Sequence, residues 1–392
     1  MKKALFLPAI ALLFSCGGSD LEESKSDFNY DLVYEIDTVM VDPGDHFFFL
    51  NWGMTISDIS SDAKTLYNLN PNTFLLEIVD LDQMKLKETV QLEREGPNGV
   101  GGGGFIGSIQ VLDNGNLKLF DFNKIYEINL QGELLETFEF EKSEWTGYEM
   151  AEEEKIDIYG TFSSDGKLFF TRLVEEGFGE PGRGFLKLDM ETKTMMLMDI
   201  GDFYERLDKF SVTMSTDQMR MVSGEEIHKG FIKGDFVITN SAFNEAFIWE
   251  EGSDSLQMKK FNASLTSNEK TAEVTSMVES REAFMEAINK KNEQVVFEKM
   301  IYHPEADLIW RFAQEKERMI ADSVIKKQVF TLFDTDYNVV YEEKVEDYPI
   351  SSIRFFKDGM LYTYVNIDDE MAFARIKPIG GSTSGESLIR MD

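Results

Sequence analysis

The segment Ser164-Asp165-Gly166-Lys167-Leu168-Phe169 places a tight turn directly before an apolar run, and this arrangement recurs along the chain. An Asp-Gly pair favours the two-residue turn of a β-hairpin, and the apolar run after it indicates a strand. Each such turn is therefore expected to join two neighbouring antiparallel strands. The other five turns are Ser61-Asp62-Ala63-Lys64-Thr65-Leu66-Tyr67, Asp113-Asn114-Gly115-Asn116-Leu117, Lys233-Gly234-Asp235-Phe236, Pro304-Glu305-Ala306-Asp307-Leu308-Ile309 and Lys357-Asp358-Gly359-Met360-Leu361-Tyr362.

The spacing of these six turns indicates a repeat fold. Measured between Asp62, Asp113, Asp165, Asp235, Asp307 and Asp358, it is 51, 52, 70, 72 and 51 residues. A recurring period near this length is typical of repeat architectures. Second apolar runs, such as residues 124–130, lead into a third turn and a fourth strand. The chain is therefore predicted to be all-β, a six-bladed β-propeller with four-stranded antiparallel blades.

The N-terminal segment Tyr30–Val41 alternates like a strand but has no hairpin partner before it. The last repeat, Ile353–Ile379, supplies only about three strands. We expect the N-terminal strand to become the outer strand of the last blade and close the ring, because this removes two open sheet edges. The predicted blades are Phe47–Leu92, Phe105–Phe140, Ile156–Ile200, Phe231–Phe261, Val295–Val345 and Ile350–Lys377.

Inserted residues explain the two long spacings. Residues 201–228 and 263–294 lie between predicted blades, and 173–183 and 313–326 lie between the second and third strands of blades 3 and 5. In a propeller these connections emerge on one face, at a mouth of the central channel, so binding is expected there. Within the second insertion, Glu273–Lys290 has helical spacing, with a start near Ser267 and Glu269. This helix either faces a ligand or packs on blade 4 or 5 as a stabilising lid.

The first fifteen residues form a predicted secretory signal, with Lys2 and Lys3 before the apolar stretch Ala4–Phe14. That stretch is too short to span a bilayer. Leu13-Phe14-Ser15-Cys16 resembles the lipobox of bacterial lipoproteins, whose cysteine thiol carries the lipid, and Cys16 is the single cysteine of the chain. We expect a palmitate-bearing lipoprotein with a signal peptide at 1–15, a tether at 16–29, a propeller at 30–380 and a C-terminal tail at 381–392.

The formal charge is −33, and loss of Lys2 and Lys3 with the signal makes it −35. Such a charge disfavours nucleic acid and anionic membrane surfaces as partners. The acidic run Gly17–Glu23 resembles the signal that exports Bacteroidetes lipoproteins to the outer face of the outer membrane. A plain solvated tether is the alternative. We therefore expect a monomeric outer-membrane lipoprotein at the cell surface, with a periplasm-facing position as the alternative.

The loop Glu93–Phe105, just before blade 2, contains Gly96-Pro97 and the run Gly101–Gly104. It is similar to the Gly-Pro-Gly entry loop of the uncharacterised six-bladed propeller lipoproteins of Bacteroidetes, whose blades look like NHL-type repeats. Asn98 and Val100 interrupt the tight form of that loop. The layout of the whole chain resembles this family, which implies binding at the cell surface or in the periplasm but no transferable activity.

The sequence offers little evidence for a metal or a phosphate site. The glycine run 101–104 is followed by no Lys-Ser/Thr pair, so a close backbone approach is favoured over a phosphate cradle. His46, His228 and His303 are far apart, so zinc is not expected. The segment Asp334–Asn338 has oxygen spacing like that of a calcium loop, but it lacks the later bidentate Glu and is interpreted as a turn. We expect no cofactor, with calcium as a weak alternative.

The sequence has no Gly-x-Ser-x-Gly motif, and no Ser and His are placed to suggest a catalytic triad, so nucleophilic catalysis is poorly supported. The favoured function is therefore a non-catalytic binding or scaffold protein for a peptide, glycan or protein partner. The alternative is a carbohydrate-active hydrolase or lyase with carboxylates at the channel. Arginine forks and aromatic rings in the loops are the candidate ligand-binding residues. They are Trp52, Arg94, Trp145, Arg172, Arg183 and Arg311.

The predicted anchor is tested by Cys16→Ala. Without the thiol no lipid can be attached, so the protein should move from the membrane fraction to the soluble fraction when cells are lysed and centrifuged. Retention of the variant in membranes would refute the anchor. Protease treatment of intact cells distinguishes the two faces, because only surface-exposed protein is cut.

Overall fold

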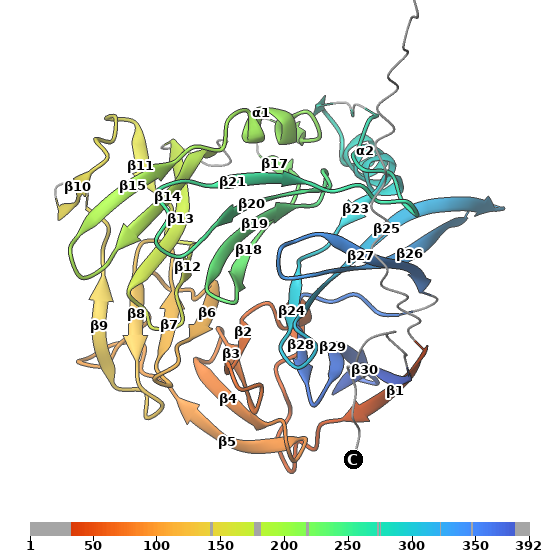
Figure 1. Cartoon of the computed structure of the whole chain (residues 1–392). Coiled ribbons are helices and arrows are strands. Elements are labelled where there is room, and N and C mark those ends of the chain that lie inside the picture. Colours follow the sequence, from red (N-terminus) through yellow and green to blue (C-terminus); the bar gives the residue numbers. More distant parts are fainter. Residues whose placement is uncertain are drawn as a thin grey trace, which may run out of the picture.

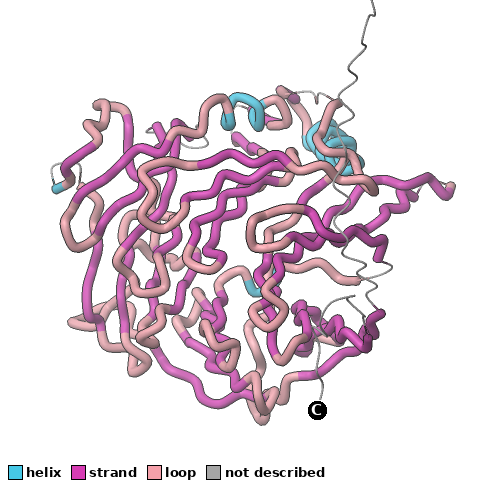
Figure 2. The backbone as a smooth tube through the Cα atoms, in the orientation of Figure 1, coloured by secondary structure: helices cyan, strands magenta, loops and turns pink. Residues whose placement is uncertain are grey.

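The computed structural model describes residues 33–380 apart from 142–143, 176–181, 217–218, 273, 275, 322 and 346–347. The predicted signal peptide, Cys16 and its tether, and the tail 381–392 lie outside the described residues. Within them the protein is all-β, and strands dominate the backbone trace (Figure 2). The helices are short: η1 (Asn51–Met54), α1 (Phe203–Asp208) and α2 (Arg281–Glu293).

The strands form antiparallel sheets that follow one another around the molecule in chain order (Figure 1). Three of these sheets have four strands each and neighbours that are consecutive in sequence. They are β2–β5 (Ser57–Ile59, Thr65–Asn70, Leu75–Asp80, Lys85–Gln91), β6–β9 (Ser108–Val111, Leu117–Phe120, Ile125–Ile128, Leu134–Phe138) and β18–β21 (Ile227–Ile232, Asp235–Asn240, Glu245–Trp249, Gln257–Lys260).

Two further sheets have a divided first strand. In one, β11 (Glu154–Ile156) and β12 (Thr161–Phe162) both pair with β13 (Leu168–Glu175), followed by β14 (Gly182–Asp189) and β15 (Thr194–Met198); the short β10 (Thr146–Gly147) pairs with β15 in parallel. In the other, β23 (Val296–Phe297) and β24 (Ile301–His303) both pair with β25 (Leu308–Ile320), followed by β26 (Ser323–Phe333) and β27 (Val339–Val345).

All six predicted turns are hairpins between the first two strands of a sheet. Lys233 and Gly234 have φ values of 53° and 96°, and Asp358 and Gly359 have values of 49° and 69°. Positive φ at both central residues defines the two-residue turn whose twist matches that of the flanking strands. The predicted hairpins are therefore confirmed.

The N-terminal segment pairs with the end of the chain, as predicted. β1 (Val33–Met40) runs antiparallel to β30 (Glu370–Gly380), which follows β28 (Arg354–Lys357) and β29 (Met360–Ile367) in the same four-stranded sheet. Arg375 holds the two strands together, because its Nε and Nη2 atoms each lie 2.6 Å from a different oxygen of Asp37. This bidentate pair joins two residues that are 338 positions apart in the sequence.

The core lies between neighbouring sheets. Phe170 of β13 stacks on Phe236 of β19 with ring centroids 4.1 Å apart, and Phe120 of β7 meets Phe162 of β12 at 6.1 Å. The contacts join side chains of adjacent sheets into aromatic clusters. A sheet therefore buries its face against the next sheet rather than against a separate layer.

The two insertions between sheets pack against each other. β16 (Val212–Ser215) pairs with β17 (Arg220–Ser223) and, in parallel, with β22 (Met277–Val278) from the second insertion. Phe284 and Ala287 of α2 close a small apolar cluster with Val212 and Met214. Both insertions therefore form one subdomain, and α1 and α2 lie along the same side of the ribbon in Figure 1.

The prediction of a helix over Glu273–Lys290 is partly wrong. α2 begins only after Ser280, whose hydroxyl accepts a hydrogen bond from the Ala283 N–H at 3.2 Å. Met277 and Val278 belong to β22, because they pair with β16. A helical spacing of apolar residues cannot reveal that a distant strand offers them backbone hydrogen bonds.

The expected connection at 313–326 is a strand extension instead. β25 and β26 continue as one long hairpin to Ile320 and Ser323, and Glu315 faces Lys327 across the ladder at 3.2 Å. The charged composition misled the prediction, because cross-strand ion pairs support a solvent-exposed ladder. The strand β18 begins at Ile227, before the predicted start at Phe231. The prediction missed these residues because His228 and Lys229 interrupt the apolar run.

The intersheet core is tested by Phe170→Ala. This ring is fully buried between two sheets, so truncation should cost about 3–5 kcal/mol of unfolding free energy. The matched control is Phe47→Ala, whose ring is 88% exposed and whose loss should change stability by less than about 0.5 kcal/mol. Urea unfolding followed by tryptophan fluorescence measures both. Equal effects would contradict the intersheet core.

Candidate functional site

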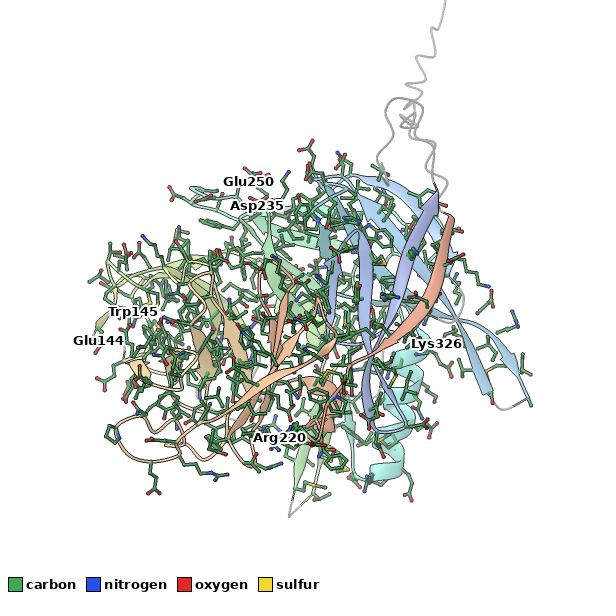
Figure 3. All side chains as sticks on the ribbon, turned by 90° about the horizontal axis from the view of Figure 1, so that it is seen from below. Glu144, Trp145, Arg220, Asp235, Glu250 and Lys326 are labelled. Carbon is green, nitrogen blue, oxygen red and sulfur yellow. The ribbon has the colours of Figure 1, made fainter. Side chains whose placement is uncertain are left out.

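The protein has two distinct faces. Figure 3 places Asp235, in one of the six hairpin turns, near the upper edge of the molecule, and Arg220, in the first insertion, near the lower edge. We call the side with the hairpin turns the hairpin face and the side with the insertions the insertion face. Each face opens into a cavity.

The cavity on the insertion face, here the insertion cleft, has a volume of about 730 Å³. Its walls come from the connection between β7 and β8, from residues 155–159, from the β13–β14 hairpin and from the first insertion. The lining side chains used below are Phe122, Asp157, Tyr159, Arg172, Tyr204 and Glu225. Polar and aromatic groups thus converge on one concave surface.

Arg172 and Asp157 form the charged part of the cleft. The Nε and Nη2 atoms of Arg172 lie 2.8 and 2.6 Å from Asp157 Oδ2, and the Asp157 N–H donates to the Arg172 carbonyl at 3.0 Å. This pairing engages two of the five N–H donors of the guanidinium. Because the Arg172 side chain is 37% exposed, its other donors remain accessible to a ligand.

Tyr204 brings the first insertion into the cleft. Its ring stacks on Phe185 at 6.2 Å and lies against Gly182, where a Cβ atom would come within 2.2 Å of the ring. Burial raises the pKa of the Tyr204 hydroxyl, which has no hydrogen-bonding partner among the described residues. An unpaired buried hydroxyl at the edge of a cleft is a position for a polar ligand atom.

Glu225 anchors the wall of the cleft. This buried carboxylate lies 2.7 Å from the Lys270 Nζ and 3.5 Å from the Lys291 Nζ, and it accepts a hydrogen bond from Ser241. Burial lowers the pKa of Lys270, and the nearby Glu225 carboxylate opposes that effect. This group of three charges therefore joins the two insertions, and the bond from Ser241 ties them to the sheet β18–β21.

An aromatic strip leads from the cleft across the insertion face. We define it as Trp52, Phe105 and Phe122, whose neighbouring ring centroids are 5.9 and 5.8 Å apart. The side chains of Trp52 and Phe122 are 55% and 57% exposed, and Phe122 also lines the cleft. Contiguous exposed rings on a monomer are typical of binding surfaces. The strip and the cleft therefore form one candidate site.

The candidate residues from the sequence divide into three groups. Arg172 lines the cleft and Trp52 lies in the strip. Arg94 and Arg183 are exposed with local partners, since Arg94 lies 4.4 Å from the Phe74 ring centroid and donates to the Asn72 carbonyl, and Arg183 pairs with Glu175. Neither arginine lines the cleft, although Glu175, the partner of Arg183, does.

Trp145 and Arg311 are buried, so the prediction that they project from exposed loops is wrong. Trp145 is 7% exposed and stacks on Phe140 at 5.9 Å, at the periphery of the molecule (Figure 3). Arg311 is 1% exposed, lies 4.8 Å from the Phe297 ring centroid and donates to Asn244. Burial lowers the pKa of Arg311 to about 9. Its position between Trp310 and Phe312 in a strand was the available signal.

Sequence reasoning missed Asp157, Tyr159, Tyr204 and Phe122. Tyr204 lies in an insertion that was expected to be functional, so its position was a usable signal. Asp157 gave no signal, because its role depends on Arg172, which comes from a different strand and pairs with it only in the fold.

The glycine run and the Asp-rich turn have structural roles. The Gly103 N–H donates to Asp121 Oδ2 at 2.7 Å, and a Cβ atom at Gly103 would lie 1.8 Å from the other Asp121 oxygen. Close approach therefore requires glycine, as expected. The segment 334–338 is a turn in which the Asn338 N–H donates to Asp334 at 2.7 Å. The described residues contain no cluster of three His, Cys, Asp or Glu side chains that could hold a metal ion.

A family model describing a domain of unknown function, DUF4221, matches residues 29–344. The chain belongs to the DUF4221 family. No curated protein matches the sequence. In the part of the chain that the structure covers, no helix is long and apolar enough to cross a membrane.

The similar solved structures are distant in sequence. A DUF4221 protein from Bacteroides vulgatus is 14% identical with a TM-score of 0.62, over 89% of this chain and 98% of that one. A Bacteroides fragilis protein named provisionally as exported is 9% identical with a TM-score of 0.48, over 89% and 96%. The Cps50 β-propeller domain of Myceliophteria thermophila is 8% identical with a TM-score of 0.38, over 88% and 99%. The arrangement of antiparallel sheets around the molecule makes the fold of this DUF4221 chain propeller-like (Figure 1).

The wall of the insertion cleft is tested by Glu225→Ala. Its loss leaves two buried ammonium groups without their carboxylate, which should cost about 3–5 kcal/mol and loosen the insertions. Urea unfolding and protease sensitivity of residues 201–294 measure the effect. Glu205→Ala, at an exposed position of the same insertion, is the control and should change stability little. Unchanged protease sensitivity of the Glu225 variant would contradict the anchoring role.

Proposed function

We propose that this DUF4221 protein is a non-catalytic, lipid-anchored binding protein of the cell envelope, which holds a peptide, glycan or protein partner on its insertion face. The observation that carries the proposal is the aromatic strip running into a cleft that contains the Arg172–Asp157 pair. The strip offers flat apolar surfaces, and the arginine fork offers directed donors. Together they suit an extended ligand with alternating apolar and polar groups.

Three of the four carboxylates that line the insertion cleft are held by cations, which favours binding over catalysis; the fourth is Asp208. Asp157 is paired with Arg172, Glu175 with Arg183, and Glu225 with Lys270. A hydrolase needs one carboxyl group that gives up a proton and a second that attacks or activates water. Because these three carboxylates are each held by a cation, the pairs support a role in shaping the cleft.

The same proposal includes a six-bladed propeller architecture and a location at the outer membrane. The pairing of β1 with β30 supports a six-bladed ring closed by the N-terminal strand. The hairpin turns supply the first two strands of each proposed blade. The lipobox-like segment at Cys16 and the acidic run after it support an outer-membrane lipoprotein that faces outward.

The binding role is tested with arrays of glycans and peptides, followed by calorimetry on the hits. Trp52→Ala and Arg172→Met should each weaken binding about tenfold or more, since about 1.4 kcal/mol corresponds to a tenfold change. Arg94→Met is the matched control, because Arg94 is exposed but lies outside the cleft, and it should bind like the wild type.

Two results would contradict the binding proposal. The first is the absence of any ligand across both arrays and a panel of outer-membrane proteins. The second is hydrolysis of glycans by the protein, which would favour the carbohydrate-active alternative. One observation makes that alternative specific: Asp58 lines the other cavity, and burial raises its carboxyl pKa to about 6, as suits a general acid. Loss of hydrolysis in Asp58→Asn would then establish it.

A further inference from the structure

The groups left unpaired in the insertion cleft indicate which class of ligand fits it. Arg172 uses two of its five N–H donors on Asp157, which leaves three. Asp157 accepts these two hydrogen bonds and one from the Tyr159 N–H at 3.1 Å, so about one of its four lone-pair sites stays free. The Arg172–Asp157 pair therefore offers donors and an acceptor on neighbouring atoms.

Two tyrosines lie beside this pair. The Tyr204 ring stacks at 6.2 Å on Phe185, which is the cross-strand partner of Arg172 in the β13–β14 ladder. Directly paired residues of an antiparallel ladder project from the same side of the sheet, so the Tyr204 ring is held toward the guanidinium. Among the described residues, neither the Tyr204 nor the Tyr159 hydroxyl has a hydrogen-bonding partner. Each hydroxyl both donates and accepts.

This mixture of free groups matches the hydroxyl groups of a ligand. A sugar carries several hydroxyls on neighbouring carbon atoms, and each of them donates and accepts, as the free groups of the cleft require. An amino group only donates and a carboxylate only accepts, so either one would leave part of the cleft without partners. Because unpaired polar groups in a closed site cost free energy, the cleft favours a polyhydroxylated ligand.

The charges of the cleft favour a neutral ligand. The charged side chains that line it are Lys155, Asp157, Arg172, Glu175, Asp208 and Glu225. Four of them are in ion pairs, and Lys155 and Asp208, one of each sign, are exposed. The cleft therefore has no excess of unpaired charge. The formal charge of −33 on the chain also disfavours acidic sugars through its long-range field.

The aromatic strip adds the apolar contact that a sugar ring makes. The C–H groups on one side of a sugar ring are apolar, and they pack on the negative face of an aromatic ring. Trp52, Phe105 and Phe122 follow one another at 5.9 and 5.8 Å, so successive rings of an oligosaccharide can contact them in turn. Trp52 has a φ of 58°, in the left-handed region, and such backbone strain is concentrated at ligand-binding sites.

The backbone around the cleft is unsuited to an added peptide strand. An extended peptide often binds by pairing with a continuous sheet edge. Here β11 and β12 have only three and two residues, and between them the Gly160 N–H donates to the Ile158 carbonyl at 2.9 Å. The wall that carries Asp157 and Tyr159 therefore presents side chains rather than a strand edge.

The cavity on the hairpin face, with a volume of about 860 Å³, has a different lining. Six carboxyl groups and three lysines line it, namely Asp58, Asp113, Asp165, Asp189, Glu191 and Glu251 with Lys167, Lys229 and Lys299. Its rings Phe120, Phe162 and Trp249 are buried, and Phe231 is half-buried. This cavity therefore lacks both the balanced charge and the exposed rings of the insertion face.

We propose that the ligand of the insertion face is a neutral oligosaccharide. Its rings stack along the aromatic strip, and the hydroxyls of one ring enter the cleft and bond Arg172, Asp157 and Tyr204. This inference rests on the binding role proposed above and selects one of its ligand classes. Phe185 and the close approach to Gly182 fix the Tyr204 ring, so its hydroxyl contacts one hydroxyl of the sugar in a defined direction.

Calorimetry on the full mature chain tests short neutral oligosaccharides of glucose, mannose, galactose and xylose against oligogalacturonate and short peptides. A neutral oligosaccharide should bind, and its affinity should change little with salt, because salt screens only charges. Tyr204→Phe keeps the ring and removes the hydroxyl, so it should weaken binding about threefold to tenfold. Tyr302→Phe is the matched control, because the Tyr302 hydroxyl donates to Asp307 on the hairpin face at 2.6 Å, and this variant should bind like the wild type.

Tryptophan fluorescence gives a second readout, on the strip itself. Trp52 is exposed, whereas Trp145, Trp249 and Trp310 are buried, so acrylamide should quench Trp52 selectively. A bound oligosaccharide should protect Trp52 from this quenching. Melting curves confirm that the variants are folded.

The outcomes separate this inference from the binding role on which it rests. Peptide binding that is lost in Trp52→Ala and Arg172→Met, with no binding of any sugar, would overturn the inference and leave the binding role intact. Absence of all binding would overturn both. Preference for oligogalacturonate, a steep fall of affinity with salt, or equal weakening of sugar binding by Tyr204→Phe and Tyr302→Phe would overturn the inference alone.

Discussion

The structure depends on aromatic contacts between neighbouring sheets. No four-stranded sheet here buries its faces alone, and rings such as Phe170 and Phe236 lie at the boundary between two of them. A buried aromatic side chain contributes several kcal/mol, so each boundary couples two sheets strongly. The first and last described strands are joined in a different way, because β1 pairs with β30 in a backbone ladder and Arg375 binds Asp37. Stability is thus shared around the molecule rather than concentrated in one sheet.

Because of this arrangement, the side chains of the inner strands need not all be apolar. Because the rings at the boundaries supply the burial, strands such as β18 can place His228, Lys229 and Gly230 along a small pocket of about 70 Å³. The connections on the two faces are likewise free to differ. The hairpin face uses tight turns of fixed length, and the insertion face carries long segments, the aromatic strip and the insertion cleft. Two cavities of different chemistry therefore coexist on one scaffold.

Local turn chemistry explains why so much of the fold could be predicted. Lys233-Gly234 and Asp358-Gly359 require positive φ, and that requirement is written in the residues themselves. The residues of the candidate site were harder to predict from the sequence than the fold. Arg172 and Trp52 lie on the insertion face as expected, but Arg311 is buried by rings from other sheets. Asp157 and Tyr204 gained their roles from partners on separate strands. Contacts across sheets leave no local pattern, so the fold was more accessible than the site.

The parallel pairing of β16 with β22 joins two insertions that are separated by a complete sheet in the sequence. Neither segment can be exchanged on its own, because the other would lose its strand partner and Glu225 would lose Lys270 or Lys291. The two segments are therefore a single structural unit carried in two pieces. A designer who wishes to rebuild the insertion face must transplant both pieces together.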